Sequence, residues 1–296
     1  KTVRVDRDEE GALAAALGDG CDVLVDMVAF DRDHARQLTG LADRVGSAVV
    51  ISSGAVYADD RGRSFDTQDE PGGFPHYPSP IVESQPTVAP GDTTYSTRKV
   101  ALEQELLAGA LPATLLRAGA VHGPHCRTPR ELFFVKRALD GRKVRVLAFG
   151  GKSRFHPVHV SNVAEMIRLA ALKPGSRVLN SGDPTAPTVA EIAAAIDRVM
   201  GLEIETVLVD GPPPVGDVGA SPWGIDHPVV YDMGAAEREL GYRAVTDYEE
   251  SLPATVEWLV EELRGREWTQ AFAKMAARDG DLFKYAEEDA WLARRK

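Results

Sequence analysis

Residues 48–54 read Ala-Val-Val-Ile-Ser-Ser-Gly, an apolar run that ends in two hydroxyls and a glycine. Such a run predicts a strand that is buried on both faces, because β-branched side chains pack well in a covered sheet. A second run of this kind, Val23-Leu24-Val25, precedes it, and a helical pattern over 31–45 separates the two. Strands that alternate with helices predict βαβ units and therefore a parallel sheet.

This alternation continues along most of the chain. We expect strands over residues 3–5, 23–25, 48–51, 114–117, 144–147 and 178–180. We expect helices over residues 9–17, 31–45, 95–108, 131–139, 162–172, 234–240 and 251–264. A capping box, Thr188-Val189-Ala190-Glu191, opens a further helix that Gly201 ends. The sequence therefore predicts an α/β protein.

The composition is that of an ordinary globular protein of 296 residues, 44% of them hydrophobic and 27% charged. A net charge of −11 disfavours non-specific binding to nucleic acid or to an anionic membrane. The two cysteines, Cys21 and Cys126, are too few for a disulfide framework, so we expect a reducing, cytoplasmic location. We expect neither a transmembrane span nor a signal peptide, since no apolar run has the required length or position.

Residues 58–92 form a long stretch that is rich in Pro, Gly, Asp and Ser. A loop of this length inside a compact domain is usually functional or mobile. Two shorter irregular stretches cover 122–130 and 211–228. We expect the specificity for a substrate to lie in these three loops.

Tyr95 and Lys99 are four residues apart in the stretch Thr93-Thr94-Tyr95-Ser96-Thr97-Arg98-Lys99. This spacing occurs by chance in many helices, but on a helix it places a phenol beside an ammonium on one face. A free tyrosine has a pKa of about 10, and a neighbouring cation favours its ionised form. The pair is therefore a candidate acid/base near neutral pH.

Ser52 and Ser53 directly follow the predicted strand over 48–51. Ligands bind outside the carboxyl ends of parallel strands, where a hydroxyl can reach a bound substrate. The alternative is that the Ser-Ser-Gly turn only caps the next segment. Taken alone, the turn favours capping; together with Tyr95 and Lys99, it favours a binding site.

These stretches, with Leu116-Arg117-Ala118-Gly119-Ala120-Val121-His122-Gly123-Pro124, resemble the extended short-chain dehydrogenase/reductases, the NAD-dependent epimerase/dehydratase family. Residues 154–164 look like that family's R-x-x-x-V-x-V-x-D-x-A stretch, with Asn162 where aspartate is usual, and 22–29 look like its fourth strand. The resemblance spans roughly residues 3–263. It implies a Rossmann-like, doubly wound parallel sheet with a smaller C-terminal substrate-binding lobe.

The resemblance implies catalytic roles for three residues. Tyr95 matches the general acid/base that exchanges a proton with the substrate oxygen, and Ser53 matches the hydroxyl that hydrogen-bonds this oxygen. Lys99 matches the lysine that holds the nicotinamide ribose and keeps the pKa of the tyrosine low. Hydride transfer to or from C4 of a bound NAD or NADP would accompany the proton transfer.

The resemblance also implies which other positions line the two ligands. Asp6 matches an acid that contacts the adenine amino group, and the loop after Arg117 matches the one that lines the nicotinamide. The implied cofactor contacts are Asp6, Arg7, Val28, Ala29, Ser52, Lys99, Ala118 and Val121. The implied substrate contacts are Ser53, Gly54, His122, Arg145 and Arg154.

Two further features have competing interpretations. Arg142, Lys143 and Arg145 form a small basic patch, which is either a solvated surface or a contact for a substrate phosphate, as in nucleotide-sugar enzymes. The stretch over 122–126, His-Gly-Pro-His-Cys, has no second group of ligands at zinc-site spacing. We interpret it as a loop near the active site and expect no metal.

The family's Gly-x-x-Gly-x-x-Gly fingerprint has no match, since Gly11, Gly18 and Gly20 have another spacing. Those glycines let a pyrophosphate approach backbone amides at a helix N-terminus. By the count of strands, residues 3–5 are the third strand of the sheet, without a neighbour, and the strand at 23–25 has an open edge. We therefore expect the sequence to begin inside a longer polypeptide. The alternative is a truncated homologue without a cofactor site.

We predict a nucleotide-binding lobe over 1–118 and about 152–180, a substrate-binding lobe over 119–151 and 181–264, and a helical extension over 265–296. The predicted activity is that of an NAD(P)-dependent epimerase, dehydratase or reductase on a hydroxyl or carbonyl substrate such as a nucleotide sugar. The alternative is a non-catalytic protein of the same fold that binds a partner or RNA. By analogy with the family we expect a homodimer, and neither nucleic acid nor a membrane as a partner.

Overall fold

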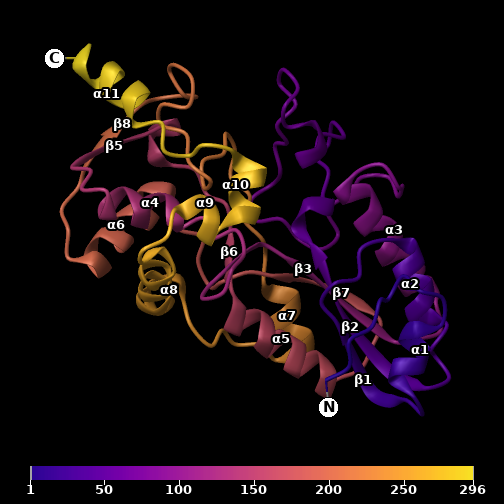
Figure 1. Cartoon of the computed structure of the whole chain (residues 1–296). Helices are drawn as coiled ribbons and strands as arrows, with labels where there is room; N and C mark the ends of the chain where they lie inside the picture. Colours follow the sequence, from indigo (N-terminus) through magenta and orange to yellow (C-terminus); the bar gives the residue numbers. More distant parts are fainter. Residues whose placement is uncertain (1, 296) are drawn as a thin grey trace. The chain divides into compact units, whose positions relative to one another are not determined.

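The computed structural model of the protein describes residues 2–295 and divides into two compact units (Figure 1). Unit 1 runs up to Gly119 and adds Val163–Ser181 and Tyr231–Arg243. Unit 2 comprises Ala120–Asn162, Gly182–Val230 and the chain from Ala244 onward. Each unit is therefore assembled from several separate stretches of the chain.

Unit 1 is built on a parallel sheet of four strands in the order β1-β2-β3-β7. Its strands are β1 Cys21–Asp26, β2 Val45–Ser53, β3 Ala113–Ala118 and β7 Arg177–Ser181. Its helices are α1 Ala12–Leu17, α2 Arg32–Thr39, α3 Tyr95–Ala108, α5 Val160–Leu172 from Val163 onward, and α7 Gly234–Leu240. The parallel α/β sheet expected from the alternating pattern is confirmed.

Both faces of this sheet are covered, as Figure 1 shows, with α2 and α3 on one side and α5 and α7 on the other. Alternate residues of β2 point to opposite faces: Ala48 and Val50 pack with the first pair of helices, and Val49 packs with the second. Burial on both faces explains why the strand reads as a continuous apolar run. The sheet is doubly wound, and the carboxyl ends of β2 and β3 lie together in register from Ala48↔Ala113 to Ser53↔Ala118.

The predicted strand over residues 3–5 is wrong. This stretch is irregular, and Val3 and Val5 are 52% and 38% exposed. A strand needs a hydrogen-bonded neighbour, and within residues 2–295 the sheet ends at β1, which pairs only with β2. Val25, near the end of β1, is accordingly 44% exposed.

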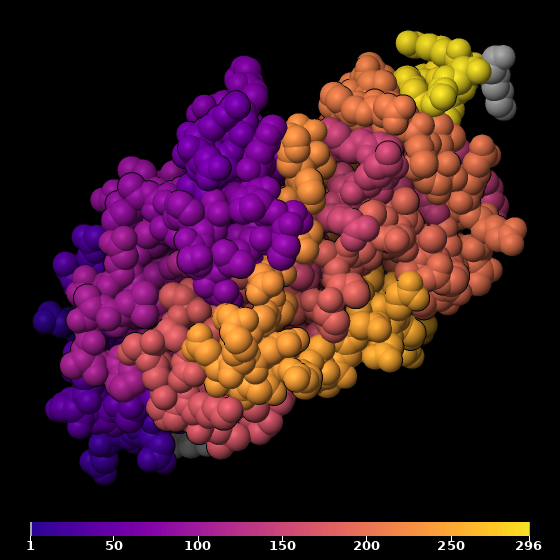
Figure 2. Space-filling view, turned by 180° about the vertical axis from the view of Figure 1, so that it is seen from behind, coloured from indigo at the N-terminus to yellow at the C-terminus, as the bar shows by residue number. Residues whose placement is uncertain are grey.

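The long segment between β2 and α3 is ordered, and part of it rises from the surface of unit 1 (purple in Figure 2). It contains two short 3-10 turns, Gly54–Val56 and Phe65–Thr67. A bridge between Tyr57 and Thr87 joins its two ends. The segment therefore has defined local structure, and a functional role for it stays a prediction.

Unit 2 contains two pairs of parallel strands, β4 with β6 and β5 with β8. The strands are β4 Ala120–His122, β5 Val144–Leu147, β6 Pro157–His159 and β8 Glu205–Leu208. The helices are α4 Leu132–Leu139, α6 Val189–Met200, α8 Tyr248–Leu263, α9 Trp268–Ala271, α10 Ala273–Asp279 and α11 Tyr285–Ala293. None of the helices described between residues 2 and 295 is long and apolar enough to cross a membrane.

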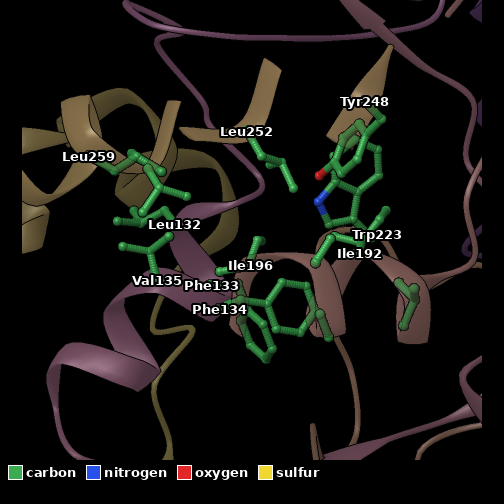
Figure 3. Packing of buried hydrophobic residues seen from close by; sticks show 14 of the residues in the cluster. Leu132, Phe133, Phe134, Val135, Ile192, Ile196, Trp223, Tyr248, Leu252 and Leu259 are labelled. Atoms are coloured by element: carbon green, nitrogen blue, oxygen red, sulfur yellow. The ribbon is translucent and has the colours of Figure 1, made fainter. Parts of the chain in front are cut away.

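The core of unit 2 is one large apolar cluster to which α4, α6 and α8 contribute. Figure 3 shows Tyr248 beside Trp223, with their ring centroids 6.1 Å apart, and Ile192 of α6 close to both. Trp268, Phe272 and Met275 of the C-terminal tail belong to the same cluster. The tail is thus part of this core rather than a separate extension, and unit 2 is nearly as large as unit 1.

Candidate active site

Lys99 lies on α3 with its ammonium buried at the carboxyl ends of β1 and β2. Its Nζ donates to the carbonyl oxygen of Ala29, at 2.6 Å, and to that of Ile51, at 3.0 Å. Burial lowers the pKa of Lys99 to about 8, although the charges of Asp26 and Glu103 oppose this. An ammonium has three N–H donors, so one remains for a ligand after these two carbonyls.

Tyr95 is the first residue of α3 and is 46% exposed. The Nζ of Lys99 lies 5.9 Å from the centroid of its ring, so the two residues share one face of the helix. The ring also contacts Phe30, in the turn after β1, at 5.7 Å between centroids. The phenol is therefore accessible and lies next to a buried cation.

Ser53 is the last residue of β2 and is partly buried. Its Oγ accepts a hydrogen bond from the amide of Ala55 at 3.1 Å and caps the following 3-10 turn. The hydroxyl still has its proton to donate, so capping and contact with a ligand are compatible. The next residue, Gly54, is packed so closely that an added Cβ would lie 2.0 Å from the Tyr231 hydroxyl oxygen.

A buried polar network lies directly behind these residues, and the sequence did not predict it. Arg117 of β3 donates to both carboxylate oxygens of Glu103 on α3, at 3.0 and 2.6 Å. Ser52, which was expected to contact the cofactor, instead donates to Glu103 at 2.5 Å. A charged residue within the apolar strand, Arg117, and an acidic residue one turn after Lys99, Glu103, are the signals that could have indicated such a pair.

The same network extends to the loop between β2 and α3. The Arg117 guanidinium lies 4.8 Å from the ring centroid of Tyr57, whose hydroxyl donates to Asn180 Oδ1 at 2.5 Å. Burial raises the pKa of Tyr57 to about 12, although Arg117 lowers it. The backbone amide of Asn180 donates to Glu83, and burial raises the pKa of the Glu83 carboxyl. The Arg117 guanidinium and these buried hydrogen bonds therefore hold the strand ends and the loop together.

The residues expected to contact the adenine end lie around β1. Arg7 pairs with Asp26 at 2.9 Å and also donates to Gln37, while Asp6 accepts the amide of Asp8. Arg7 and Gln37 are among the residues that line a pocket of about 180 Å³ between α1 and α2. Val28 is 70% exposed just beyond β1.

In unit 2, His122 belongs to a buried cluster that is closed to solvent, although His122 Nδ1 and Glu131 Oε2 have no hydrogen-bond partner among the described residues. Its Nε2 is 2.7 Å from Asp183 Oδ2, and its Nδ1 is 3.9 Å from Glu131. Tyr248 donates to the same Glu131 carboxylate at 3.1 Å. Burial alone would raise the pKa of Asp183, but the bonds from His122, the His159 amide and other donors outweigh it and lower this pKa. His122 is 1% exposed, so we leave it out of the proposed substrate contacts.

Asn162, which replaces the family's usual aspartate, has a specific reason to be an amide. Its Nδ2 donates to Asp183 Oδ1 at 2.8 Å and to the Thr246 carbonyl oxygen, and its Oδ1 accepts the amide of Val245. An aspartate here would place a second carboxylate against Asp183 instead of a donor. The carboxylate of Asp183 thus explains why an amide suits position 162 better than an aspartate.

The predicted basic patch is largely neutralised by acids. Arg145 forms a buried ion pair with Asp197, at 3.0 Å between Nη1 and Oδ1. Arg142 pairs with Glu288 and Asp289 of α11. Arg154, in contrast, is exposed and donates to the Ala186 carbonyl oxygen at 2.5 Å. Of the arginines assigned to the substrate, Arg154 is the one that stays accessible.

The remaining predicted positions are distributed between the two units. Ala29 and Ala118 follow or end strands of unit 1 at the same edge as Lys99, whereas Val121 is 40% exposed on β4 of unit 2. The described residues, 2–295, contain no group of three or more His, Cys, Asp or Glu side chains that would hold a metal ion. The structure thus brings Tyr95, Lys99 and the end of β2 together within unit 1.

No protein-family model and no curated protein matches the sequence. Solved structures do match by fold. Bacillus anthracis dTDP-glucose 4,6-dehydratase, in complex with NAD, has a TM-score of 0.60 and 21% identity, over 84% of this chain and 75% of that one. Bacillus cereus UDP-glucuronic acid 4-epimerase, with NAD and a fluorinated UDP-sugar, has a TM-score of 0.64 and 13% identity, over 88% and 81%.

A third similar structure is the UDP-glucose 4-epimerase of Thermotoga maritima with UDP-glucose. It has a TM-score of 0.57 and 22% identity, over 78% of this chain and 69% of that one. These are enzymes of the type that the sequence resembles. The chain therefore has the Rossmann-like fold of the nucleotide-sugar dehydratases and epimerases.

Proposed function

We propose that this protein is an NAD(P)-dependent epimerase, dehydratase or reductase that acts on a hydroxyl or carbonyl group. The observation that carries the proposal is the buried Lys99 ammonium directly beside the accessible Tyr95 phenol. Burying an ammonium is costly, and the two backbone carbonyls and the nearby charges of Asp26, Glu103 and Asp31 offset the cost only in part, since the pKa of Lys99 is lowered to about 8. A lysine kept in such a place, with one donor unused, supports a functional role rather than a structural one.

The residues of unit 1 fit the nicotinamide end of a dinucleotide. Lys99 would bind the ribose hydroxyls with its remaining N–H, and Ala29 and Ala118 lie at the same edge of the sheet. When bound, NAD(P) supplies the site that accepts or donates hydride. At the other end, Asp6 has an exposed carboxylate for an adenine amino group. The fold of the NAD-bound neighbours supports this placement.

In the proposed reaction the chain's own residues move the proton. Tyr95 gives its proton to the substrate oxygen, or takes the proton from it, as hydride moves at the attached carbon. Ser53 donates a hydrogen bond to the same oxygen and orients it. The Lys99 ammonium stabilises negative charge on the phenol oxygen during the transfer.

We propose a nucleotide sugar as the substrate class. The similar enzymes act on dTDP-glucose, UDP-glucose or UDP-glucuronic acid by their names. In this chain the exposed guanidinium of Arg154 is suited to a diphosphate, because arginine binds phosphate oxygens through two parallel N–H groups. A homodimer and a cytoplasmic location also remain predictions.

Turnover by the full-length protein tests the proposal. The assay offers NAD or NADP with dTDP-glucose, UDP-glucose and UDP-glucuronic acid, and follows products by NMR. We expect one sugar to react, and we expect Tyr95→Phe to lower kcat by about 10²–10⁴-fold with an unchanged circular-dichroism spectrum, since that is the usual worth of a general acid. Tyr285→Phe, in α11 of unit 2, is the control and should keep activity. Full activity of Tyr95→Phe would contradict the assigned role.

A further inference from the structure

Tyr95 lies at the N-terminus of a helix, where the backbone has the fewest intrahelical hydrogen bonds. As the first residue of α3 it precedes the first complete turn of hydrogen bonds, and helix ends fray first. Its accessible ring contacts Phe30 and lies near Lys99, but neither contact fixes the backbone that carries it. A proton donor must be held within a fraction of an ångström, so something has to secure this end of the helix.

One carboxylate holds the residues on both sides of Tyr95. Asp66 Oδ2 accepts a hydrogen bond from Thr94 Oγ1 at 2.6 Å, and Asp66 Oδ1 accepts one from Ser96 Oγ at 2.9 Å. Asp66 is 28 and 30 residues away in sequence, in the loop between β2 and α3. A negative charge at a helix N-terminus is also favoured by the helix dipole.

The bond from Thr94 also sets the direction of the helix cap. Thr94 is the N-cap of α3, and its Oγ1 accepts the amide of Thr97 at 3.2 Å. Because the hydroxyl proton points to Asp66, the oxygen lone pairs face the helix amides. Asp66 therefore completes the cap as well as anchoring it.

Asp66 is itself fixed by a loop that closes on itself. Ser64 caps the 3-10 turn that carries Asp66, accepting its amide at 3.1 Å. The neighbouring Phe65 ring lies against Phe74 and Tyr77, with centroids 6.0 and 6.4 Å away. The hydroxyl of Tyr77 donates to the carbonyl of Tyr57 at 2.9 Å, just beyond β2.

A second carboxylate ties the base of the same loop. Asp59 accepts the amides of Arg61, Arg63 and His76, each at 2.9 Å. Burial would raise the pKa of Asp59, but these amides and the Arg63 guanidinium lower it to about 2. The segment over 59–77 is thus held at its two ends by Asp59, and Asp66 in its middle contacts the start of α3.

We propose that Asp66 is a positioning residue for Tyr95, and that the segment over 59–77 sets the geometry of the proton donor. The inference rests on the proposed function, because it takes Tyr95 as the reacting acid. Asp66 contacts the helix on either side of Tyr95 and acts through this backbone. Its replacement should therefore disturb Tyr95 without removing a group that touches the substrate.

The first test measures Tyr95 without any ligand. The full chain is labelled with 3-fluorotyrosine, and the Tyr95 resonance is assigned by its loss in Tyr95→Phe, since the chain has seven tyrosines. In Asp66→Asn we expect this ¹⁹F resonance to shift and broaden. We also expect exchange of the Thr97 and Arg98 amides, which bond to Thr94, to rise about fivefold, as for a lost cap. Ser96→Ala, which removes only one of the two bonds, should give a smaller effect in the same direction.

The matched control is Asp69→Asn, which removes the same charge from an exposed position on the same segment. It should leave both the ¹⁹F resonance and the exchange rates at their wild-type values. If Asp66→Asn and Ser96→Ala both match the wild type while all variants stay folded, the positioning role is overturned. If Asp69→Asn gives the same change as Asp66→Asn, the lost negative charge of the segment is responsible rather than the two hydrogen bonds to Asp66, and the proposal also fails.

The second test uses turnover of the sugar nucleotide that the wild type converts. We expect Asp66→Asn to lower kcat by about 10- to 100-fold with KM nearly unchanged, because a small misplacement affects the reacting geometry more than binding. A rise in KM of the same size with kcat unchanged would contradict a positioning role. If the wild type converts no offered sugar, the proposed function fails, while the ¹⁹F and exchange measurements still decide whether Asp66 holds Tyr95.

Discussion

The two units handle buried polar groups in opposite ways. In unit 2, the cluster of His122, Asp183 and Glu131 is closed to solvent, at 1%, 0% and 0% exposure. His122 bonds Asp183, whereas its Nδ1 and Glu131 Oε2 have no hydrogen-bond partner among the described residues. In unit 1, the Arg117–Glu103 pair is equally closed, but one turn of α3 away Lys99 keeps a donor unused beside a phenol that is 46% exposed. Unused bonding capacity occurs in both units, but only the ammonium of unit 1 lies beside an accessible side chain, where a ligand can meet it, and this combination indicates chemistry.

Breaking the closed pair in unit 1 should have the largest effect on stability. Arg117→Met leaves the Glu103 carboxylate buried without its guanidinium partner, and the loss of one member of a buried pair costs about 3–5 kcal/mol. Urea denaturation followed by circular dichroism measures this. The control is Arg168→Met, whose pair with Glu165 is exposed, and its midpoint should not move. Equal midpoints for the two variants would show that the buried network is not stabilising.

The buried Lys99 ammonium should make the stability of the protein depend on pH. The pKa of Lys99 is lowered to about 8 in the fold, from 10.5, so the folded state favours the neutral amine. Its contribution to the free energy of unfolding is therefore smallest below about pH 8 and rises by about 3 kcal/mol as the pH increases to about 10.5.

Comparison with Lys99→Met isolates this contribution from all other titrating groups. The difference in unfolding free energy between wild type and variant should grow in favour of the wild type from pH 7.5 to pH 10. The measurement is urea denaturation at four or five pH values in this range. A difference that is constant with pH would mean that the amine titrates alike in the folded and unfolded chain.

The buried cluster around Asp183 in unit 2 can be tested by removing one of its hydrogen-bond donors, the Asn162 amide. Asn162→Asp replaces a donor to Asp183 by a second carboxylate, and we expect a loss of about 1–3 kcal/mol, the usual cost of an unsatisfied buried polar group. Asp183→Asn in the same chain should restore part of this loss, because an amide again faces a carboxylate. Thermal unfolding of the two single variants and the double variant measures the coupling. Strict additivity would exclude a direct interaction.

Local signals predicted the elements of unit 1 well, and the partners of buried charges poorly. The helix expected to carry Tyr95 and Lys99 and to end at about Ala108 is confirmed as α3. Its N-terminal cap, formed by Thr94 and Thr97, also depends only on neighbours in sequence. The strand over 48–51 was found as part of β2 for a similar reason, since its apolar run marks burial on both faces. The strand expected over 3–5 failed because a strand depends on a partner elsewhere.

The candidate site shows the same limit. Tyr95 and Lys99 were identified because a helix brings residues four apart to one face. Arg117 and Glu103 were not identified as a pair, since only the packing of α3 on β3 joins them. Asp66 was hidden for the same reason, 28 residues before Thr94 in a loop without periodicity.

Binding of a reduced nicotinamide dinucleotide to the full-length protein tests the central claim most directly. Nicotinamide fluorescence is followed while NADH or NADPH is titrated into wild type, Lys99→Met and, as a control, Lys152→Met on the exposed surface of unit 2. We predict saturable binding to wild type and to Lys152→Met, and binding that is about 10-fold weaker or more for Lys99→Met, the loss expected for a charge-assisted hydrogen bond. The absence of binding of both dinucleotides to the folded wild type, or equal affinity in Lys99→Met, would contradict the account.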